Sequence, residues 1–133
     1  MGKRLSVIIA LFFCGYGVFG QVTKFRAQQF AFKYYQENAG WTEWSDWEET
    51  SLLITYNSNT IRIAIHEDPV RTFDIIASEV DTNEAGDRIL HMNCIGENGD
   101  EVLFKMVYDV NYNMQFYIDY GKVVIVYNVI VLD

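Results

Sequence analysis

The sequence predicts an all-β, antiparallel domain, most simply an eight-stranded meander that closes into a small up-and-down barrel. Apolar residues recur at every second position from Lys24 onward, polar turn signals separate the runs, and no helical period of 3.6 residues appears. A meander leaves two unpaired edges, and closure removes both. A two-sheet sandwich is the alternative. An outer-membrane barrel is less favoured, because polar side chains such as Arg62 and Asp74 alternate with the apolar stripes.

Composition sets the size of the domain and excludes several classes of protein. The chain has 133 residues, of which 50% are hydrophobic and 16% aromatic, with a formal net charge of -8. This is enough apolar surface for one folded domain, and the proportions exclude disordered and fibrous chains. The acidity argues against nucleic-acid partners, whose phosphates are recognised by clustered Lys and Arg.

Residues 1–20 are expected to be a secretory signal peptide. Lys3 and Arg4 precede an apolar stretch over residues 5–13, and small residues follow near Gly20. Cleavage before Gln21 leaves residues 21–133 as a single β-barrel-like domain without a transmembrane span, in the periplasm or outside the cell. An uncleaved anchor is less favoured, because the apolar run is shorter than the roughly 20 residues of a spanning helix. Lipidation at Cys14 is also less favoured, because bulky Phe13 precedes it.

The first half of the domain predicts four strands. Phe25 and Ala27 form one stripe, and the pair Gln28-Gln29 shifts the phase by one residue, as a β-bulge does. The stripe then continues through Phe30, Phe32 and Tyr34. The next three strands carry the stripes Leu52, Ile54 and Tyr56, then Ile61, Ile63 and Ile65, then Phe73, Ile75 and Ala77.

The second half predicts four more strands. Their stripes are Leu90, Met92 and Cys94, then Val102, Phe104 and Met106, then Met114, Phe116 and Ile118, then residues 123–132. The Asn98-Gly99 pair predicts a hairpin with a type I′ turn. Residues 123–132 are apolar on both faces, so that both faces should be covered, by the sheet, by the N-terminal segment or by a homodimer partner.

The three tryptophans are the main candidate for a binding site. Trp41, Trp44 and Trp47 stand three residues apart, which on a strand places Trp44 on the face opposite the other two. Their indoles either plug one end of the barrel or form a platform that stacks on sugars and planar ligands. Nearby acids such as Glu43 would then hydrogen-bond hydroxyl groups. Tyr56 and Tyr127 complete the candidate ligand-binding residues.

Other polar groups give weaker signals. After cleavage Cys94 is the one cysteine, interpreted as a small buried residue rather than a catalytic thiol. His66 and His91 have no metal-binding spacing, and neither a metal nor a cofactor is expected. The segment from Asp81 to Asp87 partly matches a calcium loop, but a solvated hairpin loop is the favoured interpretation.

Several segments together resemble a group of small exported bacterial all-β proteins of unknown function. They are Phe32-Lys33-Tyr34-Tyr35, the tryptophan segment from Gly40, the run Ile-Arg-Ile-Ala-Ile at 61–65, and Val126-Tyr127-Asn128-Val129 followed by Leu132-Asp133. The resemblance covers most of the chain. It implies export and an all-β fold, and it implies no activity and no site residues. The small up-and-down barrel expected from the strand pattern would be lipocalin-like.

We therefore expect an exported, non-catalytic binding protein for a small apolar or sugar-like ligand, held in the barrel mouth or on residues 41–47. The alternative is an envelope-associated protein-interaction module, which an interior packed solid with Phe104, Met106, Phe116 and Ile118 would favour. An enzyme using paired carboxylates comes third, because no nucleophile motif or defined acid pair is present.

Overall fold

The computed structural model describes residues 22–111 and 113–132, all in strands and short connections. Its strands are β1 (Val22–Gln36), β2 (Gly40–Trp41), β3 (Glu48–Asn57), β4 (Arg62–His66), β5 (Arg71–Thr82), β6 (Arg88–Gly96), β7 (Glu101–Tyr108), β8 (Met114–Asp119) and β9 (Val123–Leu132). The expected signal peptide, with Cys14, lies outside the described residues. Within them, no helix is long and apolar enough to cross a membrane.

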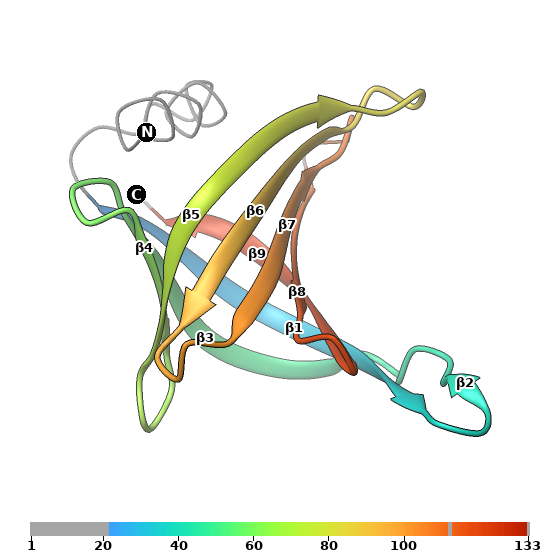
Figure 1. The fold of residues 1–133 in the computed structure, drawn as a ribbon. Coiled ribbons are helices and arrows are strands. Elements are labelled where there is room, and N and C mark those ends of the chain that lie inside the picture. Colours follow the sequence, from blue (N-terminus) through green and yellow to red (C-terminus); the bar gives the residue numbers. More distant parts are fainter. Residues whose placement is uncertain (1–21, 112, 133) are drawn as a thin grey trace.

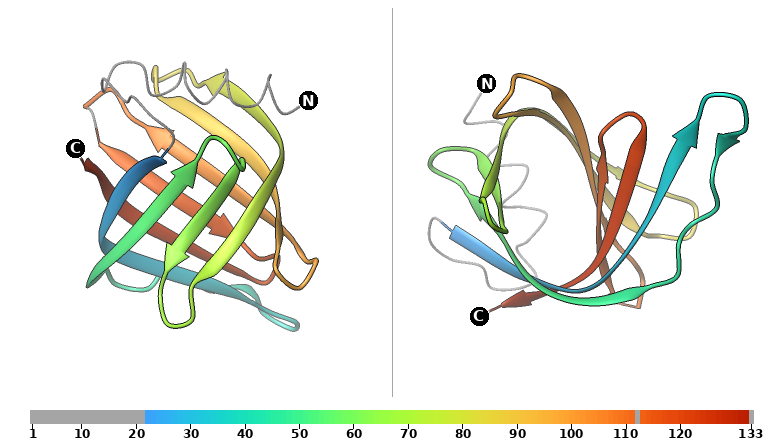
Figure 2. Two further views of the ribbon diagram at one scale, coloured as in Figure 1. Left: turned by 90° about the vertical axis from the view of Figure 1, so that its left-hand side faces the viewer. Right: turned by 90° about the horizontal axis from the view of Figure 1, so that it is seen from below.

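Eight of these strands form a closed antiparallel barrel. The sheet runs in sequence order from β1 through β3 to β9, and β1 also pairs with β9, which closes the ring (Figures 1 and 2). The predicted eight-stranded up-and-down barrel is therefore confirmed, and the sandwich does not form. The extra strand β2 pairs only with the far end of β1, in a hairpin that projects from the barrel (Figure 2, right).

β1 is long enough to belong to both the barrel and this projecting hairpin. It pairs with β3 up to Phe30 and with β9 up to Tyr34, and its last residues pair with β2. The register shifts between Ala27 and Gln29 against both neighbours, which confirms the predicted bulge. Beyond Phe30, β3 no longer covers one edge of β1, and the tryptophan segment lies there instead.

The barrel interior is a packed hydrophobic core. Phe25, Phe104 and Phe116 are buried and meet edge to face, with ring centroids of Phe25 and Phe116 5.2 Å apart. Met106 and Ile118 are buried in the same cluster. Close packing leaves the middle of the barrel to side chains, as in other barrels of eight strands. Any ligand site must therefore lie at an end of the barrel or on its outer wall.

Two local predictions were wrong. Ala77 is exposed and does not belong to the core stripe. A second register shift lies between Ile75 and Ala77, and it reverses which side chains of β5 face the core after that point. The Asn98-Gly99 hairpin forms, but its connection spans residues 97–100, and of that pair only Gly99 has a positive φ (83°). A type I′ turn needs a positive φ at both central residues, so the turn is of another type.

The two apolar faces of β9 have different surroundings. Tyr127 and Val129 belong to the core cluster inside the barrel. Val126 points the other way, yet it is buried, and so is its cross-strand partner Ala31. On the other side of β9, Val126 pairs with Tyr117 of β8, so the three form one row across the outer wall. The tryptophan segment reaches this row.

Candidate functional site

The tryptophan segment is held against β1 by two side chains that complete the hydrogen bonding of its free edge. Thr42 donates its backbone N–H to the Tyr34 carbonyl (2.9 Å) and accepts the Tyr34 N–H at Oγ1 (3.0 Å). Ser45 does the same with Phe32, at 2.8 and 2.9 Å. The segment thus advances three residues for every two of β1. Gly40 precedes it with φ 77°, a backbone conformation that favours glycine.

The three-residue repeat places tryptophans on the outside of the protein. Trp41, Trp44 and Trp47 are 44%, 43% and 46% exposed, so the indoles do not plug a barrel end. The Lys33 ammonium lies over both the Trp41 ring (5.4 Å) and the Trp44 ring (4.8 Å), so these two rings flank one cation. The expectation that strand alternation separates them fails, because residues 42–47 are not a strand.

Trp44 also joins this segment to the outer wall of the barrel. Its ring centroid lies 6.2 Å from that of Tyr117 on β8, in an edge-to-face arrangement. The Lys105 ammonium in turn lies 4.4 Å from the centroid of Tyr117. Trp41, Lys33, Trp44, Tyr117 and Lys105 therefore form a continuous chain of rings and cations, which we call the aromatic surface.

A groove of about 310 Å³ continues the aromatic surface across β6, β7, β8 and β9. Its outward-facing lining includes Tyr117, Lys105, Asp119, Asn93 and His91. Cross-strand register brings these residues together, because Tyr117 pairs with Lys105 and Lys105 with His91. Burial raises the pKa of Tyr117, so its hydroxyl stays protonated and remains a hydrogen-bond donor at neutral pH.

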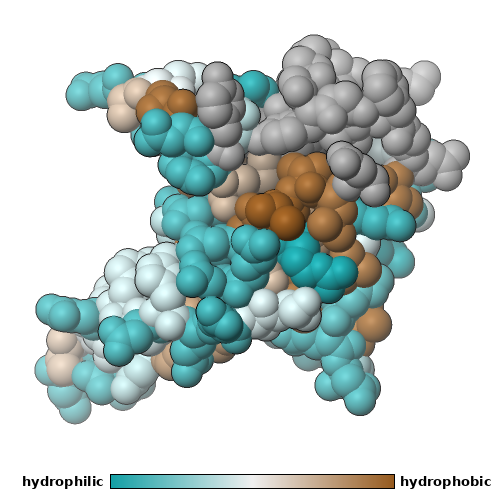
Figure 3. Space-filling view, turned by 180° about the vertical axis from the view of Figure 1, so that it is seen from behind, coloured by the Kyte–Doolittle hydropathy of each residue, from teal (hydrophilic) through white to brown (hydrophobic). Residues whose placement is uncertain are grey.

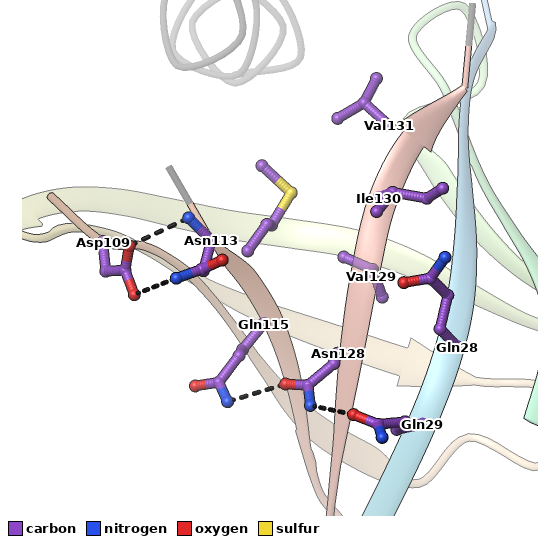
Figure 4. A pocket seen from close by; sticks show the side chains of 10 residues that line it. Gln28, Gln29, Asp109, Asn113, Gln115, Asn128, Val129, Ile130 and Val131 are labelled. Carbon is purple, nitrogen blue, oxygen red and sulfur yellow. Dashed lines mark hydrogen bonds between the residues drawn. The ribbon is translucent and has the colours of Figure 1, made fainter. Parts of the chain in front are cut away.

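A row of amides leads away from Tyr117 along the outer wall. The Tyr117 hydroxyl donates to Gln115 Oε1 at 3.1 Å. Gln115 Nε2 then donates to Asn128 Oδ1 (2.9 Å), and Asn128 Nδ2 donates to Gln29 Oε1 (3.0 Å), as Figure 4 shows. The row borders a hollow of about 600 Å³ beside Asp109, whose pKa is lowered by the backbone N–H of Asn113.

Figure 3 shows the rear face of the molecule, hollowed between two projecting hairpins, with hydrophobic surface gathered near its centre.

A separate pocket of about 270 Å³ opens at one end of the barrel, which we call the mouth. Its walls are mostly apolar and come from β1, β3 and β9, including Phe30, Leu52 and Ile125. Arg71 lies at its rim, with Nε 3.0 Å from Glu67 Oε2, and NH1 donates to the Tyr120 hydroxyl. Tyr127 lines the pocket, and burial raises its pKa to about 12, so its hydroxyl is neutral.

The five residues predicted as ligand-binding do not form one site. Trp41 and Trp44 come together around Lys33, and Trp47 is exposed at the end of the same segment. Tyr56 is buried in the core near the end of β3, away from the mouth, whereas Tyr127 faces the mouth.

Sequence reasoning missed the partners of the tryptophans and of Tyr127. Lys33, Tyr117 and Lys105 lie on three different strands, and Arg71 begins a fourth. The alternation of polar and apolar residues indicated only that these four side chains face outward or stand at the end of a strand. Strand order and register bring them together, and these are properties of the closed barrel rather than of any one segment.

Of the remaining sequence candidates, His91 lines the groove, whereas Cys94, Asp81 and Asp87 line neither that groove nor the mouth pocket. Cys94 is fully buried, and burial raises its pKa to about 12, as fits a core thiol. His91 lies on the opposite, outer face of β6, as predicted. Asp81 lies in β5, and Asp87 lies in the connection between β5 and β6. The Asp87 carboxylate accepts from the Asn83 side-chain amide in the same connection and from the Val110 N–H in the connection between β7 and β8.

The aromatic surface and the mouth pocket lie on opposite faces of β1. Lys33 belongs to the aromatic surface, whereas its neighbour Phe32 lines the mouth pocket. Among the described residues, no three His, Cys, Asp or Glu side chains gather as a metal site would require. The chain matches no protein-family model, no curated protein and no solved structure.

Proposed function

We propose that this is an exported, non-catalytic binding protein and that its ligand is a carbohydrate held on the aromatic surface. The observation that carries the proposal is the contact between Trp44 and Tyr117, with ring centroids 6.2 Å apart. That contact joins exposed indoles to a groove in which apolar surface, including Leu103 and Val124, lies beside the polar side chains of Asp119 and Asn93. Of the two ligand classes expected from the sequence, a sugar suits this combination better than a purely apolar molecule.

The chemistry of the surface matches both faces of a sugar ring. Aromatic rings offer flat apolar area to the C–H groups of a sugar, and Trp and Tyr keep a polar atom for water or hydroxyl groups. The groove adds the Asp119 carboxylate as an acceptor and the Asn93 amide as donor and acceptor. Lys33 and Lys105 lie over rings, where cation–π attraction holds them. The net charge of -8 favours a neutral over a polyanionic glycan.

The length of the surface favours an oligosaccharide over a single sugar. From Asp119 to Gln115 the outer wall of β8 presents Asp119, Tyr117 and Gln115 in succession, which covers about 13 Å at the usual rise of a strand. Trp41 and Trp44 extend the surface on one side, and the amides of Asn128 and Gln29 extend it on the other. Several sugar units are needed to use all of these groups.

Removal of the Trp44 ring tests the proposal. Isothermal titration of neutral hexasaccharides (cello-, xylo-, malto- and chitohexaose) should find one that binds, and Trp44→Ala should weaken its binding by about fivefold to thirtyfold, equivalent to about 1–2 kcal/mol. The matched control is Val110→Ala, which removes an exposed side chain from the opposite end of the barrel and should leave affinity unchanged. Equal affinities of Trp44→Ala and the parent protein for every bound sugar would reject the proposal.

A protein-interaction module is the second candidate, favoured by the packed interior and by one exposed strand edge. β4 pairs with β5 from Arg71 to Asp74, and the Ile75 N–H donates to the Ile61 carbonyl (3.0 Å). Beyond Ile75, β5 presents an edge on which Ile76 and Val80 are exposed. β9, the expected homodimer strand, pairs with β1 and β8 on its two sides. Light scattering over a hundredfold range of concentration tests self-association; a constant monomer mass contradicts a homodimer.

A further inference from the structure

We propose that the mouth pocket is a second, independent binding site, and that it takes a small apolar molecule with an uncharged hydrogen-bonding head group. It faces the inside of the barrel, whereas the proposed carbohydrate site lies on the outer wall. No residue lines both the mouth pocket and the outer groove. The two sites can therefore be tested separately.

The walls of the pocket define the apolar part of the ligand. Phe30, Phe32, Leu52, Val123 and Ile125 line it, and Phe30 also packs against Tyr127, with ring centroids 6.3 Å apart. Such a lining with a few polar groups is typical of small-molecule sites. The volume of about 270 Å³ corresponds to about nine water molecules, so the ligand is a single ring or a short chain.

The charges at the rim define the head group. Arg71 and Glu67 form an ion pair at 3.0 Å, so the rim carries one positive and one negative charge side by side. A carboxylate ligand would meet the Glu67 carboxylate, and an ammonium ligand would meet the Arg71 guanidinium, and like charges at close range are costly. A hydroxyl or carboxamide has both donor and acceptor capacity and meets neither penalty.

The polar groups at the rim are held in place before any ligand binds. NH1 of Arg71 donates to the Tyr120 hydroxyl, and the guanidinium carbon lies 5.8 Å from the Tyr120 ring centroid. Burial is the main cause that raises the pKa of both Tyr120 and Tyr127. Both hydroxyls therefore keep their protons at neutral pH. A fixed polar rim over an apolar pocket orients a ligand at a low cost in entropy.

Three ligands of nearly equal shape test the head-group rule: benzyl alcohol, benzoate and benzylammonium at pH 7. In nitrogen–proton correlation spectra of the protein, benzyl alcohol should shift the backbone amides of Leu52 and Ile125. Its affinity should exceed that of each charged analogue by about tenfold. The indole N–H signals of Trp41 and Trp44 should not move, which separates this site from the aromatic surface. Shifts confined to those indoles, or no shifts, would overturn the proposal.

Neutralising each partner of the ion pair should redirect the preference. Glu67→Gln should strengthen benzoate binding by about tenfold, and Arg71→Gln should do the same for benzylammonium. The matched controls are Asp74→Asn and Arg62→Gln, which break an ion pair of 2.7 Å on the outer wall and should change no affinity. A benzoate affinity that Glu67→Gln leaves unchanged would show that the ion pair does not select the ligand, even if Arg71→Gln does not fold.

Discussion

Lys33 shows how a single residue decides what the tryptophans can do. Its ammonium lies 5.4 Å from the Trp41 ring and 4.8 Å from the Trp44 ring, so one cation fixes the positions of two exposed indoles. Each such contact is worth about 0.5–1 kcal/mol at an exposed site. Because the two indole rings are already held in place, a ligand that stacks on them causes a smaller loss of side-chain conformational entropy.

Cys94 makes a residue-scale prediction about alkaline pH. Burial raises the pKa of the Cys94 thiol from 9.0, its ordinary value, to about 12 in the native protein, so between these values the unfolded chain loses a proton that the native protein keeps. Stability should therefore fall as pH rises from 9 towards 12, by at most about 1.4 kcal/mol per pH unit from this group. Urea unfolding from pH 8 to 11 measures the slope.

The variant Cys94→Ala isolates that contribution. It should be less stable than the parent protein at pH 8, because it leaves a small cavity, but its stability should fall less steeply with pH. Parallel slopes for the two proteins would contradict a buried, neutral thiol. In the native protein at pH 8, Cys94 should also resist iodoacetamide, and it should react fully in urea.

At the scale of elements, the tryptophan segment depends on two hydroxyl groups that replace a missing strand. β3 ends its pairing with β1 at Phe30, and the next free N–H groups, those of Phe32 and Tyr34, are taken by Ser45 and Thr42. A backbone donor left without a partner costs about 1–3 kcal/mol when buried. The segment therefore orders β1 beyond the barrel and presents the indoles at the same time.

Ser45→Ala tests this role. The amide of Phe32 loses its acceptor, so its hydrogen exchange should accelerate by about fivefold, the equivalent of about 1 kcal/mol. Ser51→Ala is the control, because its hydroxyl accepts from the Arg26 side chain and from no backbone amide recorded in the structure. If exchange at Phe32 is the same in all three proteins, Ser45 does not hold the segment.

The strands were predictable from sequence, but this segment was not. Alternation identified each barrel strand, and the Gln28-Gln29 pair marked the bulge of β1, because both are local properties of the chain. The path of residues 42–47 follows from side-chain hydrogen bonds to a distant strand, and it has no period-two pattern. The second bulge, beside Ala77, likewise has no local signal, so the prediction failed there.

At the scale of the whole molecule, closure of the barrel creates both sites. β1 and β9 are far apart in sequence, and their pairing places Lys33 beside Val124. β9 also pairs with β8, so Tyr117 of β8 lies on the same outer wall. The same closure brings Phe30 next to Tyr127 in the mouth. The sequence predicted a closed meander but not its register, so it predicted the tryptophans and Tyr127 as candidates without their partners.

The stability of the closed barrel depends on the aromatic cluster at its centre. Phe116 is buried between Phe25 and Phe104, so Phe116→Ala should lower the free energy of unfolding by about 3–5 kcal/mol. Leu103→Ala on the neighbouring strand removes an exposed side chain and should change it by less than about 0.5 kcal/mol. Urea titration measures both. Similar losses in the two variants would contradict a core centred on Phe116.

Intrinsic tryptophan fluorescence with hexasaccharides is the most direct test of the central claim, that the exposed indoles bind carbohydrate. All three tryptophans lie in one exposed segment, so the whole signal reports on the proposed site. The account predicts a red-shifted emission that iodide quenches, and that one of the four neutral hexasaccharides shifts to the blue and protects from iodide. An emission that is already blue, or a red emission that no sugar alters, would contradict it.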